Sequence, residues 1–185
     1  VRLAVAGDLA TYLKMTWLLK FQNGAYNMWP GSASGEDVNT QTRRMSRFLQ
    51  LNRRMFGLPY DYMGFDHQPT THEVVTLFRY MCEKGEINAA DSQFVEYSTI
   101  LNDVLSSFSH SEIVAWIDGE RVSYDQKGGL MSGLRITSII GDAWNTVITG
   151  IVIDIVRSWG FDVSTVVNYI KGDDSAVFCQ SWELA

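Results

Sequence analysis

Hydrophobic and polar positions recur at helical spacing over five segments of the chain. Asp8 is a candidate N-cap for the first segment, and Thr70 or Thr71 for the third, where Glu73 stands in the first turn. The predicted helices cover residues 9–23, 36–56, 71–85, 88–108 and 134–159.

Shorter apolar runs bounded by turn-forming residues predict strands. Asp118–Gly119 between two alternating runs is a strong hairpin signal, and Gly172–Asp173–Asp174 predicts a second hairpin. Residues 23–34 are rich in Gly, Asn, Pro and Ser and predict a loop. The predicted strands cover residues 1–6, 58–65, 113–117, 121–124, 166–171 and 175–179.

Strands and helices are interleaved without a regular βαβ alternation. This order predicts an α+β fold, with an antiparallel sheet that carries helices on one face. The length of 185 residues fits one domain or a piece of a larger one.

The composition is that of a globular chain, with 46% hydrophobic and 19% charged residues. These values exclude a disordered tail and a disulfide scaffold. Cys82, Cys179 and three scattered histidines cannot form a four-ligand zinc site, and a reducing compartment is expected. Polar residues interrupt the most apolar stretch, 136–156, so no membrane-spanning segment is expected.

The net charge of −6 argues against a free-standing nucleic-acid binder. It does not argue against a metal-dependent core whose basic surfaces lie elsewhere. The predicted helix over 36–56 is the one basic stretch, and both a nucleic-acid contact and a solvated face fit it. Its arginines are Arg43, Arg44, Arg47, Arg53 and Arg54.

Carboxylates gather at two places in the sequence. The adjacent acids of Gly172–Asp173–Asp174 repel each other unless a cation lies between them, and Mg²⁺ prefers carboxylate oxygens. Asp61 and Asp66 would lie on opposite faces of one strand, unless Gly64 breaks that strand. A strand-borne acid that faces an acid-bearing hairpin would complete a site for two metal ions about 4 Å apart. Ordinary solvated turns are the alternative.

A glycine-rich segment, Lys127–Thr137, leads into the last predicted helix. Such a loop suits close approach to a sugar-phosphate chain, and a helix start capped by Ser132 is the alternative. Asp142 and Asn145 are polar residues in an apolar stretch and need partners or a ligand when buried. Arg2 could hold a triphosphate or remain solvated.

Taken in order, these segments resemble a viral RNA-dependent RNA polymerase over nearly the whole chain. The Ser-Gly-x-Arg-x-Thr pattern, which includes Arg135, is most similar to the totivirus-like double-stranded RNA viruses. The resemblance rests on Asp61-x₄-Asp66 as motif A, Ser132-Gly133-x₃-Thr137 as motif B, Gly172-Asp173-Asp174 as motif C and Arg2 as the end of motif F.

The resemblance implies a polymerase palm, an antiparallel sheet flanked by helices, together with a small part of the fingers. Residues 1–56 would derive from the fingers and residues 57–185 would form the palm core. Within that core, motif A would lie near 61–66, motif B near 128–146 and motif C near 172–174.

The implied reaction is template-directed transfer of nucleotides from ribonucleoside triphosphates to an RNA 3′-hydroxyl, with two Mg²⁺ or Mn²⁺ ions. The catalytic and metal-binding residues would be Asp61, Asp173 and Asp174. The nucleotide-binding residues would be Arg2, Asp66, Thr137 and Asn145. The template- and RNA-binding residues would be Ser132, Gly133 and Arg135.

The sequence departs from the family pattern in three places. Gly141 stands where many members carry Asn, and Asn145, one helical turn on, either replaces it or only packs. The totivirus-like group often has Asn at the position of Asp66. Motif D, motif E and the thumb do not follow Asp174, so we expect a fragment of a larger polymerase that is inactive in isolation.

The expected partners are an RNA template, the nascent strand, ribonucleoside triphosphates, and the missing fingers and thumb, with the viral capsid as a further candidate. The expected location is the host cytoplasm, and the inside of a viral particle is the alternative. A reverse transcriptase-type palm polymerase is a rival interpretation, but Lys171–Gly172 precedes the acids where those enzymes carry an aromatic and a variable residue. A non-catalytic RNA-binding remnant is the second rival, and the intact acids argue against it.

Overall fold

The computed structural model describes residues 6–22 and 36–184. The predicted strand over residues 1–6, apart from Ala6, the loop over residues 23–34 and the side chain of Arg2 therefore lie outside the described residues. The chain divides into two compact units, each built from two stretches of sequence. The first unit comprises residues 1–25 and 64–140, and the second comprises residues 26–63 and 141–185.

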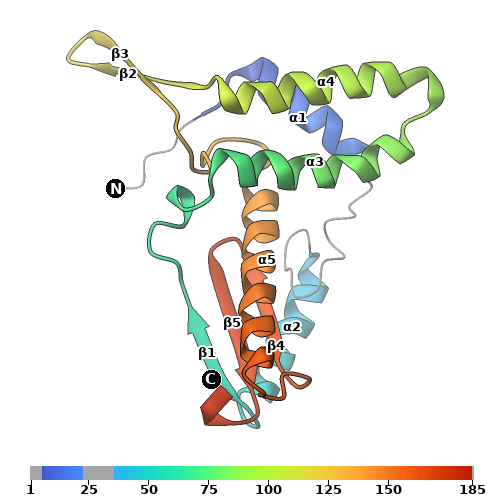
Figure 1. Cartoon of the computed structure of the whole chain (residues 1–185), viewed down its shortest axis with the longest axis vertical. Coiled ribbons are helices and arrows are strands. Elements are labelled where there is room, and N and C mark those ends of the chain that lie inside the picture. Colours follow the sequence, from blue (N-terminus) through green and yellow to red (C-terminus); the bar gives the residue numbers. More distant parts are fainter. Residues whose placement is uncertain (1–5, 23–35, 185) are drawn as a thin grey trace. The chain divides into compact units, whose positions relative to one another are not determined.

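Among its described residues, the first unit contains three helices and a hairpin (Figure 1). A short 3₁₀ turn, Phe65–His67, precedes the second of these helices. The elements are α1 (Leu9–Lys20), α3 (Thr71–Asn88), α4 (Asp91–Ser109), β2 (Glu112–Ile117) and β3 (Glu120–Asp125).

The second unit contains a three-stranded antiparallel sheet in the order β1-β5-β4. The helix α5 begins in the last residues of the first unit and continues through the second. The elements are α2 (Val38–Leu51), β1 (Phe56–Tyr60), α5 (Thr137–Ser158), β4 (Val167–Lys171), β5 (Asp174–Cys179) and a 3₁₀ turn, Trp182–Leu184.

Local capping signals fix the starts of the helices. The side chain of Asp8 accepts a hydrogen bond from the Thr11 N–H at 3.0 Å, and α1 starts as predicted. Thr70 and Glu73 form a reciprocal capping box at the start of α3. These bonds satisfy N–H groups that have no partner within the helix.

Several predicted bounds are wrong. The helix α1 ends at Lys20 and not near residue 23, α4 begins at Asp91 and not at residue 88, and β1 covers Phe56–Tyr60 and not residues 58–65. The helix α2 stops at Leu51, because Phe56 already pairs with Cys179 in the sheet. The helix α3 continues past Gly85 to Asn88, and Gly85 serves close packing instead of ending the helix. A Cβ at Gly85 would collide with the Tyr97 hydroxyl, which donates a hydrogen bond to the Cys82 carbonyl at 2.9 Å.

Helices cover both faces of the sheet in the second unit. Phe178 of β5 packs against Phe48 of α2, with ring centroids 4.6 Å apart. Ser175 lies three positions earlier, so its side chain faces the other way, and there it contacts Asn145 of α5. The α+β class with an antiparallel sheet flanked by helices is confirmed, whereas the expectation of helices on one face is wrong.

Both predicted hairpins are present. Asp118 and Gly119 form the β2–β3 turn with positive φ angles of 52° and 84°. The β4–β5 turn contains only Gly172, with a φ of 63°, and Asp173. Asp174 is already the first residue of β5 and pairs with Lys171, so the second turn is one residue shorter than predicted.

Within the described ranges, α5 is the one helix that is long and apolar enough to cross a membrane. That property rests on length and composition, and a buried core helix shares it. Asp142, Asn145 and Thr149 of α5 are nearly fully buried. Asp142 and Asn145 form hydrogen bonds to the β4–β5 turn, and Thr149 bonds to Tyr60 of β1, as in the core helix of a globular unit.

Candidate active site

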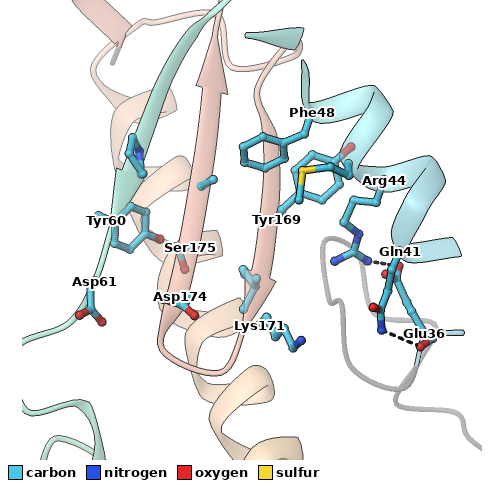
Figure 2. A pocket seen from close by; sticks show the side chains of 14 residues that line it. Glu36, Gln41, Arg44, Phe48, Tyr60, Asp61, Tyr169, Lys171, Asp174 and Ser175 are labelled. Carbon is cyan, nitrogen blue, oxygen red and sulfur yellow. Dashed lines mark hydrogen bonds and ion pairs between the residues drawn. The ribbon is translucent and has the colours of Figure 1, made fainter. Parts of the chain in front are cut away.

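Asp61 and Asp174 lie at neighbouring strand ends in the second unit. The register pairs Tyr60 with Ser175, so Asp61, directly after β1, lies beside Asp174, the first residue of β5. Lys171 pairs with Asp174 from the other side. Side chains that lie opposite each other point to the same face of a sheet. All three side chains therefore face one pocket of about 610 Å³ (Figure 2).

The far wall of this pocket comes from α2. Arg44 forms an ion pair with Glu36, and its guanidinium lies 5.3 Å from the centre of the Tyr169 ring. The other carboxylate oxygen of Glu36 is buried and has no hydrogen-bond partner among the described residues. Figure 2 shows Arg44 and Glu36 across the pocket from Asp61 and Asp174. The pocket thus combines acidic strand ends with a wall that carries both signs of charge.

The turn that carries Asp173 is held from inside the unit. The Gly172 N–H donates to Oδ1 of Asp142, and the Gly172 carbonyl accepts from Nδ2 of Asn145 at 2.8 Å. The same Nδ2 donates to the Ser175 hydroxyl at 2.8 Å. Both side chains belong to α5, and this helix therefore fixes the turn between Lys171 and Asp174.

A second branch of the same network reaches the end of β1. Oδ1 of Asn145 accepts from the Tyr62 hydroxyl at 3.1 Å and from the Thr149 hydroxyl at 3.2 Å. The hydroxyls of Tyr60 and Thr149 lie 2.9 Å apart. Burial, with a smaller contribution from the neighbouring Tyr60, raises the pKa of Tyr62 to about 12. Tyr62 therefore remains a hydrogen-bond donor at physiological pH.

The donor chemistry fits a hard divalent cation. Asp61 and Asp174 are exposed carboxylates side by side on one face, an arrangement in which like charges repel unless a cation offsets them. No group of three or more acidic, His or Cys side chains arranged for a metal is found within residues 6–22 and 36–184. The metal-binding roles of Asp61, Asp173 and Asp174 therefore all stay predictions.

The remaining predicted site residues belong to the first unit. The Asp66 carbonyl accepts from the Leu130 N–H at 2.7 Å, and the Pro69 carbonyl accepts from the Gly129 N–H at 2.9 Å. These bonds join the end of the motif A-like segment to the glycine-rich loop. Gly129 has a φ of +85°, and a Cβ there would lie 2.7 Å from the Asp66 carbonyl oxygen, so only glycine fits.

The glycine-rich loop ends at α5, which begins at Thr137 and not at Leu134 as predicted. The Thr137 hydroxyl donates to the Met131 carbonyl, and Gly133 forms a parallel bridge with Ala6. Ser132 and Arg135 are exposed. Their predicted RNA contacts stay predictions.

Sequence reasoning missed several residues of the pocket and of the network. Asp142 was singled out only as a polar residue in need of a partner, and that partner is the Gly172 backbone. Tyr60, Tyr62 and Ser175 carried no motif signal. Tyr62 follows the end of β1, and Ser175 precedes a continuous apolar run on β5, so no alternation of polar and apolar residues marked them.

Comparison with known proteins adds the family. A family model described as viral RNA-directed RNA polymerase matches residues 2–184. A search of curated proteins finds no match. Because the family match spans nearly the whole chain, this protein belongs to the viral RNA-directed RNA polymerases, which are nucleotidyltransferases.

Proposed function

We propose that this chain is the palm core of a viral RNA polymerase that extends an RNA 3′-hydroxyl with ribonucleotides by two-metal-ion catalysis. The observation that carries the proposal is the placement of Asp61 and Asp174 at paired strand ends facing one pocket, with Asp173 in the adjoining turn. This is the arrangement that motifs A and C require, and the family match supports RNA as template and product.

The two metals, Mg²⁺ or Mn²⁺, would activate the 3′-hydroxyl and stabilise the leaving pyrophosphate. Asp61 and Asp174, with Asp173, would hold them. The protein itself supplies the orientation of these carboxylates, because β1, β5 and the turn are fixed by the sheet and by α5. We assign Asp66 to the ribose of the incoming nucleotide, Arg2 to its triphosphate, and Ser132, Gly133, Arg135 and Thr137 to the template and nascent pair.

The finer assignments extend the same proposal. Residues 1–56 would belong to the fingers and residues 57–185 to the palm, although the two compact units follow other boundaries. The totivirus-like form of motif B, with Arg135, supports the proposal that the virus belongs near that group. The site of action would be the host cytoplasm or a viral particle, and the chain would need the rest of the polymerase for activity.

The test is primer extension by the full-length polymerase on an RNA template with Mg²⁺. Ribonucleotide incorporation that needs the template and disappears in Asp61→Ala is the expected result. Preferential use of deoxynucleotides would instead favour a reverse transcriptase. RNA binding without incorporation under Mg²⁺ or Mn²⁺ would overturn the catalytic proposal.

A further inference from the structure

The side chains of Asp142 and Asn145 bind the two backbone polar groups of one residue, Gly172. They stand three positions apart on α5, and therefore on one face of the helix. One accepts from the N–H of Gly172 and the other donates to its carbonyl. Both side chains are at most 1% exposed. Side chains of one helix therefore bind both backbone polar groups of Gly172, the residue that precedes Asp173 in the turn.

The amide of Asn145 has no bonding position left for another group. Its Nδ2 donates to the Gly172 carbonyl and the Ser175 hydroxyl, and its Oδ1 accepts from Tyr62 and Thr149. An amide has two N–H donors and two acceptor lone pairs, so all are engaged. A contact with the ribose, which the family resemblance suggested, would require breaking one of these buried bonds.

The turn does not need such support in order to form. A glycine with positive φ already suits a two-residue hairpin. The turn of the β2–β3 hairpin accordingly forms without hydrogen bonds from another element among the described residues. The bonds from α5 therefore do more than permit a turn. They set where the turn stands relative to β1, because Asn145 also binds Tyr62, the residue after Asp61.

We propose that Asp142 and Asn145 are positioning residues that hold the Gly172–Asp173 turn in register with the end of β1. This inference rests on the proposed function, since its purpose is to place the carboxylates of Asp61, Asp173 and Asp174 for metal binding. Groups that orient metal ligands commonly change metal affinity by about 10- to 100-fold when they are removed.

The test uses the full-length polymerase with Asp142→Ala and Asn145→Ala. We expect amide exchange of the peptide that spans Gly172 to accelerate at least about tenfold, because the bonds that protect it are lost. We also expect Mn²⁺ binding, measured by electron paramagnetic resonance without nucleotide, to weaken by about tenfold or more. RNA affinity should stay within about twofold of the wild type.

Two matched variants separate positioning from general damage. Asp142→Asn keeps an oxygen that can accept from the Gly172 N–H, so it should restore turn protection and Mn²⁺ binding. Thr146→Val removes a hydroxyl whose one hydrogen bond among the described residues is to the Asp142 carbonyl of its own helix, and it should leave both unchanged. If Asn145→Ala does not fold, Ser175→Ala is the substitute, because it removes one hydrogen bond of the same amide. It should accelerate amide exchange and weaken Mn²⁺ binding in the same direction, but by less.

The outcomes distinguish this inference from the proposed function. If the inference is right, folded Asp142→Ala and Asn145→Ala do not keep the wild-type amide exchange of the turn and the wild-type Mn²⁺ affinity. If both variants do keep them, the positioning role is overturned, whether or not the wild type polymerises RNA. Faster exchange with unchanged Mn²⁺ binding would also overturn it, since the residues would then be structural. A wild type that does not polymerise RNA would overturn the proposed function but would leave the exchange result standing.

A different observation carries a second inference, about the C-terminal end of α2. Arg47, Arg53 and Arg54 line one hollow of about 290 Å³, with Gln50 and Leu51. All three arginines are exposed, and none forms an ion pair with a described residue. Clustered arginines repel each other, and in a chain of net charge −6 they form a local basic site that an anion would neutralise.

We infer that this hollow binds the phosphate backbone of an RNA strand. Guanidinium groups match phosphate oxygens in shape and charge, and a nucleic-acid strand carries several phosphates that a group of arginines can neutralise together. Solvated arginines at a helix end are the competing interpretation, and they predict no effect on RNA binding.

The test is the salt dependence of RNA binding by the full-length polymerase, without nucleotide. The triple variant Arg47→Gln, Arg53→Gln, Arg54→Gln should lower the slope of log affinity against log salt by about 2, as expected for three lost single-strand phosphate contacts. The control replaces Lys14, Arg121 and Arg157 by Gln, each of which already pairs with a carboxylate. A slope that changes equally in both triple variants, or in neither, would overturn the inference.

Discussion

The two hairpins of this chain use similar turns in different surroundings. Both turns have two residues and at least one positive φ angle, at Gly119 and at Gly172. The β2–β3 hairpin displays Trp116, 73% exposed, and none of the hydrogen bonds found among the described residues reaches its turn from another element. The β4–β5 turn is instead bonded to Asp142 and Asn145 of α5.

The difference separates folding from function. Local turn chemistry is sufficient for either hairpin, so additional buried bonds at one turn indicate a demand on its position. An acid beside the clamped turn is a candidate for chemistry, whereas Asp118 in the unclamped turn is explained by its backbone conformation. This comparison leads to three predictions in order of expected effect.

The largest effect on stability is expected for Gly129→Ala, at a third glycine with positive φ. Its Cβ would meet the Asp66 carbonyl oxygen at 2.7 Å, so steric conflict adds to backbone strain. We expect the free energy of unfolding of the first unit to fall by about 3 kcal/mol. Thermal denaturation and amide exchange of the full-length protein measure it. A loss no larger than that of Gly119→Ala would show that the loop relaxes.

An intermediate effect is expected for the matched pair Gly119→Ala and Gly172→Ala. Neither Cβ would have a neighbour within 4 Å, so each variant has backbone strain alone, about 1 kcal/mol. Activity should separate them. We expect Gly172→Ala to lower kcat at least about tenfold, because the clamped turn shifts, while Gly119→Ala stays near wild type. Equal kcat values in both variants would contradict the claim that the two turns differ in their importance for catalysis.

The smallest effect is expected for Tyr62→Phe, which removes one bond to Asn145. The loss should be about 0.5 kcal/mol of stability at neutral pH. The pKa of Tyr62 is raised to about 12 in the folded protein, against an ordinary 10 in the unfolded chain. The stabilisation that Tyr62 gives is therefore fully present below pH 10 and is lost as the pH rises towards 12.

Denaturation curves between pH 9 and 12 test the second part of that prediction. The stability of Tyr62→Phe should fall less steeply with pH than that of the wild type. Tyr124→Phe, at an exposed position on β3, is the matched control and should keep the wild-type slope. Equal slopes in all three proteins would contradict the role of Tyr62.

Much of the local structure could be predicted from the sequence. Asp8 and Thr70 start their helices, and Asp118–Gly119 forms its turn. Gly64 does have a positive φ of 67°, but β1 has already ended at Tyr60. These features depend on a few neighbouring residues, whose conformational preferences are strong enough to decide the result.

The long-range features could not be predicted in this way. The sequence predicts a helix end at Gly85, whereas in the structure this glycine makes room for Tyr97, twelve positions later. Asp142 and Asn145 signal that a buried partner is needed, but the sequence does not say that both partners belong to Gly172. The helix α2 ends early because Cys179, 123 positions later on β5, pairs with Phe56, and this tertiary contact overrides helical propensity.

The most direct test of the central claim compares the acids of the two turns. In the full-length polymerase, Asp173→Asn and Asp118→Asn make the same chemical change in two hairpins of one chain. Mg²⁺-dependent ribonucleotide incorporation should fall by about 1,000-fold or more in Asp173→Asn and should stay near wild type in Asp118→Asn. Wild-type incorporation by a folded Asp173→Asn would contradict the assignment of catalysis to the β4–β5 turn.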